Sequence, residues 1–367
     1  MNKMLAARAN KGSTDLSLEL VDVPEPGPRD VLLKIASAGL APGTFALLER
    51  GGFLLQPTTI GHEAAGTVTA VGQEVTSFKV GDRVRLNPTL SCTNCNFCRS
   101  GQEHMCPHAA MIGFIPLGKD PTPLFARYHD GCLAEFVCAP DWLLDKLPDA
   151  ISFEVGAKMQ DLGVAWRALA SAAIPPGGTV AITAATGAMA AATIKLASFF
   201  GVGRLVLIGR SAVRLSAMKS LSTIPTDFVA LESLNADWAD TEGLTGAVAE
   251  LIPGGIDVIL DYSSTTTGVG FLQVINSLVV GGTFVHVGSN MAVLPVPLAK
   301  IMGNCWKIVG TRNTSRSDTD AVMKLLEQRL LNVDELITHR FALADLKEVA
   351  IKYRSRELPM WMGVVAP

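Results

Sequence analysis

The segment GGTVAITAATGAMAAATIKLA, residues 177–197, combines an apolar strand, a turn of small residues and a helix. The apolar run 177–183 indicates a buried strand, and the spacing predicts a helix over 188–200. This kind of unit binds a dinucleotide pyrophosphate, because the helix N-terminus offers free N–H groups and a positive dipole end. Two of the usual three turn glycines are alanines here, so an ordinary strand-to-helix turn is the alternative. The candidate cofactor contacts are Ala184, Gly187, Ala188 and Met189.

Further apolar strands surround this segment in the sequence. They are predicted at 204–208, 256–261 and 283–287, and helical patterns such as 155–173 and 212–220 separate or precede them. Continuous apolar strands that alternate with helices predict a parallel sheet with helices on both faces. The fold class is therefore α/β, with a doubly wound parallel sheet.

The end of the second predicted strand bears on which cofactor binds. A site for NAD usually has Asp or Glu there, and that carboxylate would repel the 2′-phosphate of NADP. This chain has Gly209, Arg210 and Ser211 at the strand end, with Arg214 one helical turn later. Guanidinium groups match phosphate in geometry, so the arginines favour NADP, with NAD possible. The alternative is that both arginines are ordinary surface residues.

The N-terminal part has a different pattern. Short strand-like runs at 31–36, 67–71, 83–86, 130–137 and 142–146, of which 67–71 and 83–86 are β-branched, are separated by glycine and proline, and this pattern predicts a mostly-β domain. The last portion, from about residue 295, mixes helical patterns with an apolar terminal strand. This mixture suggests that the chain returns to the first domain.

Four of the seven cysteines lie in the stretch LSCTNCNFCRSGQEHMC, residues 90–106. The spacing of Cys92, Cys95, Cys98 and Cys106 allows four thiolates to surround one zinc ion tetrahedrally. A site closed by four cysteines has no open coordination position. This zinc is therefore expected to hold the loop in place and to take no part in catalysis.

Composition excludes several classes of protein. A net charge of −3 and the lack of a basic stretch argue against nucleic acid and anionic membranes as partners. No uninterrupted apolar run reaches membrane-spanning length, and the first residues do not have the pattern of a signal peptide. A reduced, cytoplasmic setting is expected.

The order of these parts resembles the medium-chain dehydrogenase/reductase superfamily, and most of all its zinc-containing alcohol dehydrogenase branch. The resemblance is carried by GHEAAGTVTAVGQEVTSFKVGDRV from residue 61, by the cysteine loop, by DGCLAEFV and by the dinucleotide segment. It implies a GroES-like, mostly-β catalytic domain over 1–150 and 296–367. It also implies a Rossmann cofactor domain over 151–295 and a homodimer that pairs through the segment near 283–300.

Members of that branch with a catalytic zinc take one ligand from an early-loop cysteine, one from the histidine of the GHE stretch and one from a later cysteine. His62 and Glu63 stand at the second position. The early loop has Ala41 or Pro42 where the cysteine would be, and neither has a ligand atom.

The later ligand position falls at Gln160 or Asp161. Zinc catalysis needs about three protein ligands and one open position. Neighbouring residues on one extended strand point to opposite faces, so His62 and Glu63 can share a metal only if the backbone bends. We predict that the catalytic zinc is absent or weakly held, and that the zinc of the cysteine loop remains.

Without that metal, another group must stabilise the charge that develops on the substrate oxygen. The catalytic candidates are Thr44, His62, Glu63 and Asp161. A buried, catalytically idle His62 is the alternative. Phe45, Phe53 and Trp166 are candidates for an apolar pocket and equally for the core.

The resemblance implies hydride transfer between NAD(P)H and a small or medium apolar alcohol, aldehyde or ketone. The early-loop stretch GLAPGT also resembles zinc-free quinone and enoyl reductases, which would make an activated C=C bond the substrate group. A third possibility is an NADP-binding protein without catalysis, because a fold does not guarantee its chemistry.

Overall fold

The computed structural model describes residues 2–118, 120–239, 241–264, 269–294, 296–355 and 360–367. The chain divides into two compact units. The first contains residues 1–160 and 314–367, and the second contains residues 161–313. No helix in the described part of the chain is both long and apolar enough to span a membrane.

The first unit is built mainly from antiparallel strands in three sheets. A three-stranded sheet has the order β2-β1-β4, a seven-stranded sheet has the order β10-β6-β5-β3-β18-β17 with β9 paired to β3, and β7 pairs with β8. Their bounds are β1 (Lys3–Ala9), β2 (Ser17–Asp22), β3 (Asp30–Leu40), β4 (Thr58–Thr59), β5 (Ala64–Val71), β6 (Arg83–Leu86), β7 (Thr89–Leu90), β8 (Ala110–Met111), β9 (Phe136–Pro140), β10 (Leu144–Lys146), β17 (Ile337–Ala342) and β18 (Met362–Ala366).

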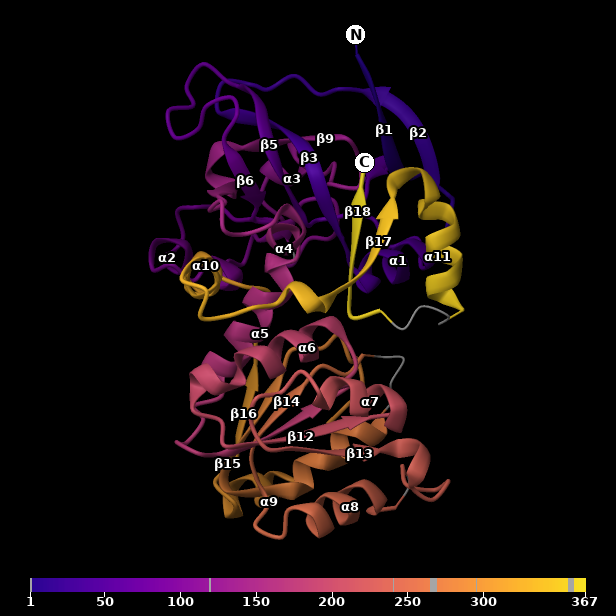
Figure 1. Ribbon diagram of the computed structural model, residues 1–367, viewed down its shortest axis with the longest axis vertical. Coiled ribbons are helices and arrows are strands. Elements are labelled where there is room, and N and C mark those ends of the chain that lie inside the picture. Colours follow the sequence, from indigo (N-terminus) through magenta and orange to yellow (C-terminus); the bar gives the residue numbers. More distant parts are fainter. Residues whose placement is uncertain (1, 119, 240, 265–268, 295, 356–359) are drawn as a thin grey trace. The chain divides into compact units, whose positions relative to one another are not determined.

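Strand β3 is the centre of the seven-stranded sheet. It pairs with β5, with β9 and with the C-terminal strand β18, where Val365 lies opposite Ala38. Segments from both ends of the chain therefore share one sheet, as Figure 1 shows. Burial of alternate apolar side chains on both faces stabilises this arrangement.

The helices of the first unit are short. They are α1 (Pro42–Glu49), α2 (Asn96–Arg99), α3 (Leu124–Arg127), α4 (Phe153–Ala157), α10 (Arg316–Glu327) and α11 (Leu346–Arg354). Phe45 of α1 and Phe53 are buried in the hydrophobic core, and the Phe45 ring packs 5.8 Å from the ring of Tyr353. Both phenylalanines therefore belong to the packed core.

The second unit is a six-stranded, all-parallel sheet in the order β13-β12-β11-β14-β15-β16. Its strands are β11 (Thr179–Thr183), β12 (Arg204–Gly209), β13 (Thr226–Ala230), β14 (Ile256–Asp261), β15 (Leu278–His286) and β16 (Lys307–Gly310). Numbered from β11, this is the order 3-2-1-4-5-6 of the Rossmann fold. The predicted α/β class with a mostly-β domain and a doubly wound parallel sheet is confirmed.

Helices cover both faces of this sheet. They are α5 (Met159–Ser171), α6 (Ala188–Leu196), α7 (Ala212–Lys219), α8 (Gly243–Leu251) and α9 (Leu298–Gly303). Figure 1 shows α6 and α7 on one face, and α8 and α9 on the other. Two-sided coverage explains why the central strands are mostly apolar and almost entirely buried. Trp166 of α5 packs edge-on against Phe200, with ring centroids 4.7 Å apart.

The structure corrects one predicted helix. The pattern over 155–173 predicted a single helix, whereas α4 ends at Ala157 and α5 begins at Met159. Lys158 lies at the junction with φ −90° and ψ 10°. It is the C-cap residue of α4, where backbone N–H groups donate hydrogen bonds to carbonyl oxygens of the helix. The break is local, and it places Lys158 at the C-terminal end of α4.

Candidate functional site

The four loop cysteines come together in the first unit. Their sulfur atoms all lie within 4.8 Å of one another, with Cys95 Sγ 3.5 Å and Cys92 Sγ 3.9 Å from Cys98 Sγ. A tetrahedral zinc with Zn–S bonds of about 2.3 Å needs sulfur atoms about 3.8 Å apart, so the cluster fits this ion. Burial raises the pKa of Cys92, but hydrogen bonds from the backbone at Asn94 and Cys95 lower it to about 6. Burial raises the pKa of Cys98 to about 12 and also raises that of Cys106, so zinc binding would displace protons from these thiols.

The cysteine loop is tied to the C-terminal part of the first unit. Glu103 Oε1 accepts a hydrogen bond of 2.5 Å from the backbone N–H of Arg316, the first residue of α10. The Arg316 side chain in turn bonds Asp145 and the carbonyl of Trp142. A carboxylate at a helix N-terminus is favourable, because it satisfies a free N–H group. The cysteine loop thus also fixes the N-terminus of α10, through the hydrogen bond from Arg316 to Glu103.

Three glycines fix the backbone that precedes His62. The Gly61 N–H bonds the carbonyl of Gly113 at 2.9 Å, and the Cys132 N–H bonds the carbonyl of Gly61 at 2.8 Å. A Cβ atom on Gly113 or Gly131 would lie about 2 Å from the Gly61 oxygen, so only glycine fits this crossing. The crossing holds the GHE stretch in one position.

His62 and Glu63 lie between this crossing and β5, outside regular strand structure. Their side chains approach each other, with His62 Nε2 3.9 Å from Glu63 Oε1. Neighbours on one extended strand would point to opposite faces, so this approach fits the absence of strand structure at these two residues. The His62 ring stacks on Phe114 with centroids 4.7 Å apart and is buried.

Glu63 also contacts a residue that the sequence reasoning missed. Its Oε2 lies 2.5 Å from Nζ of Lys158, and both side chains are 1% exposed. A lysine within the apolar run VGAKM, residues 155–159, was the available signal, because buried lysines are rare unless they are paired. The structure thus assembles His62, Glu63 and Lys158 into one buried group.

Thr44 lies in α1 and is 1% exposed. Among the described residues, no hydrogen-bond partner is found for its Oγ1. Gly43, next to it, faces the Phe114 ring that stacks on His62. A buried hydroxyl in this position is available to a bound molecule.

Ala41 is the N-cap residue of α1 and Pro42 is its first residue, and neither offers a ligand atom. Gln160 is buried at the end of the first unit, and Asp161 is the first residue of the second unit, in the first turn of α5. The structure therefore brings Glu63 and His62 together, with Asp161 in the other unit.

The predicted cofactor turn is formed in the second unit. It joins β11 to α6, and Gly187 is the N-cap residue, with Ala188 and Met189 in the first turn of the helix. Ala184 has φ +49°, a left-handed backbone conformation that residues with a Cβ atom rarely adopt. The nearest atom to a Cβ built on Gly187 is the Ala184 carbonyl oxygen at 3.8 Å. The protein's own packing therefore leaves space beside Gly187.

The end of β12 lies next to this turn. Arg214 donates a hydrogen bond of 3.1 Å to the carbonyl of Thr186. Gly209 is buried, whereas Arg210 is exposed and Ser211 is half-buried. The structure adds Glu232, whose Oε1 accepts a hydrogen bond of 2.7 Å from the backbone N–H of Ala212, the first residue of α7. The sequence of the strand end alone did not reveal this carboxylate, because Glu232 follows the next strand.

A second polar group lies at the carboxyl end of the parallel sheet. Asp261, at the end of β14, accepts hydrogen bonds from Thr183 and Ser263, and Nδ1 of His286 lies 2.6 Å from its Oδ2. The hydrogen bond with Asp261 raises the pKa of His286. Burial raises the pKa of Asp261, but the hydrogen bonds with His286, Thr183 and Ser263 outweigh it and leave that pKa low. Ligands of open α/β sheets bind at this edge.

This pair predicts a pH-dependent stability. A raised histidine pKa stabilises the fold below the unfolded value of about 6.5, and a lowered aspartate pKa stabilises it above about 3.8. The difference in unfolding free energy between wild type and His286→Gln is expected to be about 1 kcal/mol within this window. It should fall as the pH rises through the raised pKa of His286. Urea denaturation across the pH range measures it, and in an Asp261→Asn background the pH dependence should vanish. A difference that grows above neutral pH contradicts the assignment.

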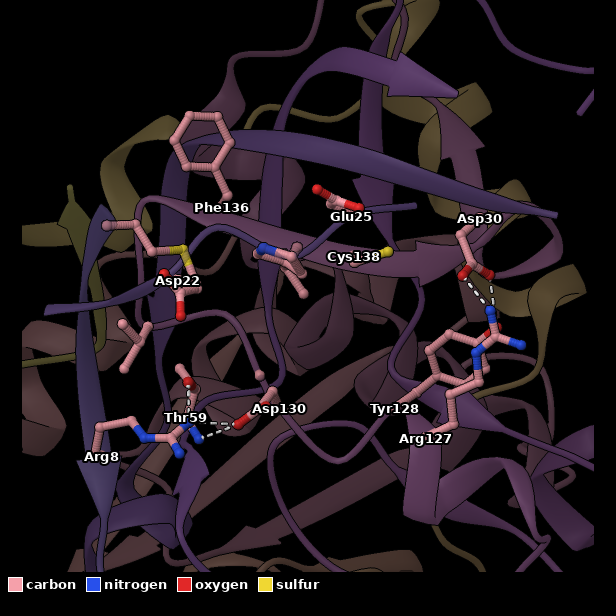
Figure 2. Close-up of a pocket in the computed structure, with 15 residues that line it drawn as sticks. Arg8, Asp22, Glu25, Asp30, Thr59, Arg127, Tyr128, Asp130, Phe136 and Cys138 are labelled. Carbon is pink, nitrogen blue, oxygen red and sulfur yellow. Dashed lines mark hydrogen bonds and ion pairs between the residues drawn. The ribbon is translucent and has the colours of Figure 1, made fainter. Parts of the chain in front are cut away.

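A separate pocket in the first unit has a volume of about 360 Å³, and Figure 2 shows residues that line it. At one end Arg8 bonds Thr59 and Asp130, and at the other Arg127 lies 2.6 Å from Asp30. These charged groups neutralise one another. The predicted catalytic residues are not among the described residues that line this pocket.

Comparison with known proteins agrees with this arrangement. Residues 27–149 match the family described as "Alcohol dehydrogenase GroES-like domain". Sorbitol dehydrogenase of Rattus norvegicus is 31% identical over 336 residues, which cover 90% of this chain and 88% of that protein. "Probable D-xylulose reductase A" of Aspergillus fumigatus is 30% identical over 357 residues, or 92% of each protein. The crystal structure of an NAD-dependent alcohol dehydrogenase has a TM-score of 0.82 at 25% identity, over 99% of this chain and 100% of that one.

The similarity extends over nearly the whole chain and includes both the GroES-like domain and the Rossmann sheet. The chain therefore belongs to the zinc-containing alcohol dehydrogenase-like family of the medium-chain dehydrogenases/reductases, and it is an NAD(P)-dependent oxidoreductase.

Proposed function

We propose that this enzyme transfers hydride between NADP(H) and a small or medium apolar alcohol, aldehyde or ketone. The observation that carries the proposal is the buried group of His62, Glu63 and Lys158 in a GroES-like domain. The buried Thr44 hydroxyl, for which no hydrogen-bond partner is found among the described residues, lies near this group. Hydrogen-bond donors of this kind stabilise negative charge on a carbonyl oxygen. We assign Thr44 and His62 to that oxygen, and Asp161 stays a candidate from the second unit.

For the cofactor, we propose that Gly187, Ala188 and Met189 present backbone N–H groups to the pyrophosphate, with Ala184 shaping the turn. The space beside Gly187 supports this, because a phosphate needs close backbone approach. When bound, the nicotinamide supplies or accepts the hydride. Gly209, Arg210, Ser211 and Arg214 would surround the adenosine ribose and its 2′-phosphate. Glu232 at the start of α7 opposes the phosphate, so NAD remains the second cofactor.

A second candidate function is the reduction of an activated C=C bond. It is favoured by the buried cation Lys158, since such a reaction needs positioning and an oxyanion donor and no metal. The third possibility, binding of NADP without turnover, is kept as an outcome of the experiment.

We propose that the loop cysteines Cys92, Cys95, Cys98 and Cys106 hold a structural zinc ion and that the enzyme works in the cytoplasm as a homodimer. The edge strand β16 supports the dimer. Four exposed apolar side chains precede it, namely Met291, Val293, Leu298 and Met302. Exposed edges and apolar patches of this kind mark protein interfaces. Sedimentation analysis that finds a monomer would contradict this assignment.

The function is tested by following NADPH and NADH fluorescence with aldehydes, ketones and enones in turn. Carbonyl turnover supports the proposal, turnover of enones alone supports the second candidate, and binding without turnover supports the third. Gly187→Val is expected to fold, since the protein leaves room for the side chain, and to weaken cofactor binding by about 100-fold, equal to about 2.7 kcal/mol. Unchanged cofactor affinity in this variant would show that the turn is not part of the cofactor-binding site.

A further inference from the structure

The buried carboxylate of Glu63 in the first unit is paired with the ammonium group of Lys158. Glu63 Oε2 lies 2.5 Å from Nζ of Lys158, and Glu63 Oε1 lies 3.9 Å from Nε2 of His62. Both members of the ion pair are 1% exposed. Charges so far from water persist only when they are paired. Glu63 is therefore already neutralised at the place where His62 points.

The surrounding backbone is shaped around this pair. A Cβ atom on Gly39 of β3 would lie 2.0 Å from Glu63 Oε2, so only glycine leaves room for the carboxylate. The break between α4 and α5 places Lys158 at a helix end instead of within a helix. Two local features, a missing side chain and an interrupted helix, thus accommodate the same ion pair.

The residues of this pocket do not fit the catalytic zinc that the family implies. The early loop has no ligand atom at Ala41 or Pro42, Gln160 offers only an amide, and Asp161 belongs to the second unit. Zinc sites that perform chemistry have about three protein ligands. In the described part of the chain, the four loop cysteines form the cluster of His, Cys, Asp or Glu ligand atoms that could share an ion.

The positive charge of Lys158 lowers the zinc affinity of this pocket more than the shortage of ligands does. A zinc ion bound to Glu63 would lie within about 7 Å of the ammonium nitrogen, because a Zn–O bond is about 2.1 Å long. At an effective dielectric constant of about 20, repulsion between the two cations weakens zinc binding roughly a thousandfold. The lysine therefore excludes the metal and takes its place as the cation paired with Glu63.

We propose that Lys158 stands in for the catalytic metal as the partner of Glu63: its ammonium group neutralises this carboxylate beside His62 and keeps divalent cations out of this pocket. This inference goes beyond the proposed function. It depends on the proposed function only in one respect, the assignment of His62 to the catalytic site. Lys158 acts through Glu63 and is in this sense a positioning residue.

A zinc titration with metal counting by mass spectrometry tests the proposal without any turnover. Wild type is expected to hold one zinc per chain, in the cysteine cluster. Lys158→Met is expected to bind a second zinc about a thousandfold more tightly than wild type does, and Lys158→Met/His62→Ala should lose it again. Lys158→Arg keeps the charge and should stay at one zinc, as should Lys79→Met, which removes an exposed lysine of the same unit.

A second, His62-dependent zinc in wild type or in Lys158→Arg would overturn the proposal. A folded Lys158→Met that binds no more zinc than wild type would overturn it too. Where Lys158→Met does not fold, rescue of folding by Lys158→Met/Glu63→Gln, with one zinc in wild type, supports the pairing, and failure of this rescue counts against it. Cofactor fluorescence on the same samples reports the proposed function separately.

Discussion

Cys106→Ala is expected to release the zinc ion of the cysteine loop and to destabilise the first unit by at least about 4 kcal/mol. That value corresponds to an ion present at a thousandfold excess over its dissociation constant. Cys106 is fully buried and completes the group of four sulfur atoms, so three thiolates would remain around an open position. Metal counting and urea denaturation measure the two effects.

The effect should extend beyond the loop itself. Glu103 bonds the N–H of Arg316, so hydrogen exchange at the start of α10 is expected to speed up in Cys106→Ala. Cys305→Ala is the matched control, because Cys305 is an exposed cysteine of the second unit. It should keep the zinc and change stability by less than about 0.5 kcal/mol. If Cys106→Ala retains one zinc per chain at full stability, the cluster is not the metal site.

Asp145→Ala is expected to destabilise the first unit by about 3–5 kcal/mol, because it leaves a buried guanidinium without its counter-ion. Arg85 is fully buried, with Nη2 2.5 Å from Asp145 and 2.7 Å from the Thr319 hydroxyl. Burial lowers the pKa of Arg85, and the negative charge of Asp145 opposes that shift. Asp145 also bonds Arg316, so its removal affects two arginines.

The control for this prediction is Asp149→Ala. Asp149 pairs with Arg83 at 3.4 Å but is 97% exposed, so its removal should change stability by less than about 1 kcal/mol. Chemical denaturation at constant pH compares the two variants. Equal losses from Asp145→Ala and Asp149→Ala would show that burial does not set the strength of these ion pairs.

Local sequence patterns predicted much of the fold. Residues 256–261 were predicted as a strand and form β14 with the same bounds, because a short, mostly apolar run that follows Pro253, Gly254 and Gly255 has few other solutions. The spacing of Cys92, Cys95, Cys98 and Cys106 likewise predicted a cluster that the structure assembles. Both features depend on residues close together in the chain, so periodicity and spacing carry the information.

Contacts between residues that are far apart in the chain could not be predicted from local sequence patterns. Glu232 reaches the start of α7 from the segment after β13, and no residue at the end of β12 indicates this carboxylate. The Asp261–His286 pair joins two strand ends that are adjacent only because β14 and β15 lie side by side. Strand order determines such pairs, and no local pattern encodes it.

The GHE stretch shows the division most clearly. The sequence by itself determined the family resemblance, the parallel sheet, the cysteine cluster and the loss of zinc ligands at Ala41 or Pro42. The tertiary structure alone decided that His62 and Glu63 turn toward each other and that Glu63 is paired with Lys158. Glu63 and Lys158 are far apart in the chain, and a helix pattern gives no warning of a break at Lys158. Only burial of both charges in one place makes their pairing obligatory, and burial is a property of the folded chain.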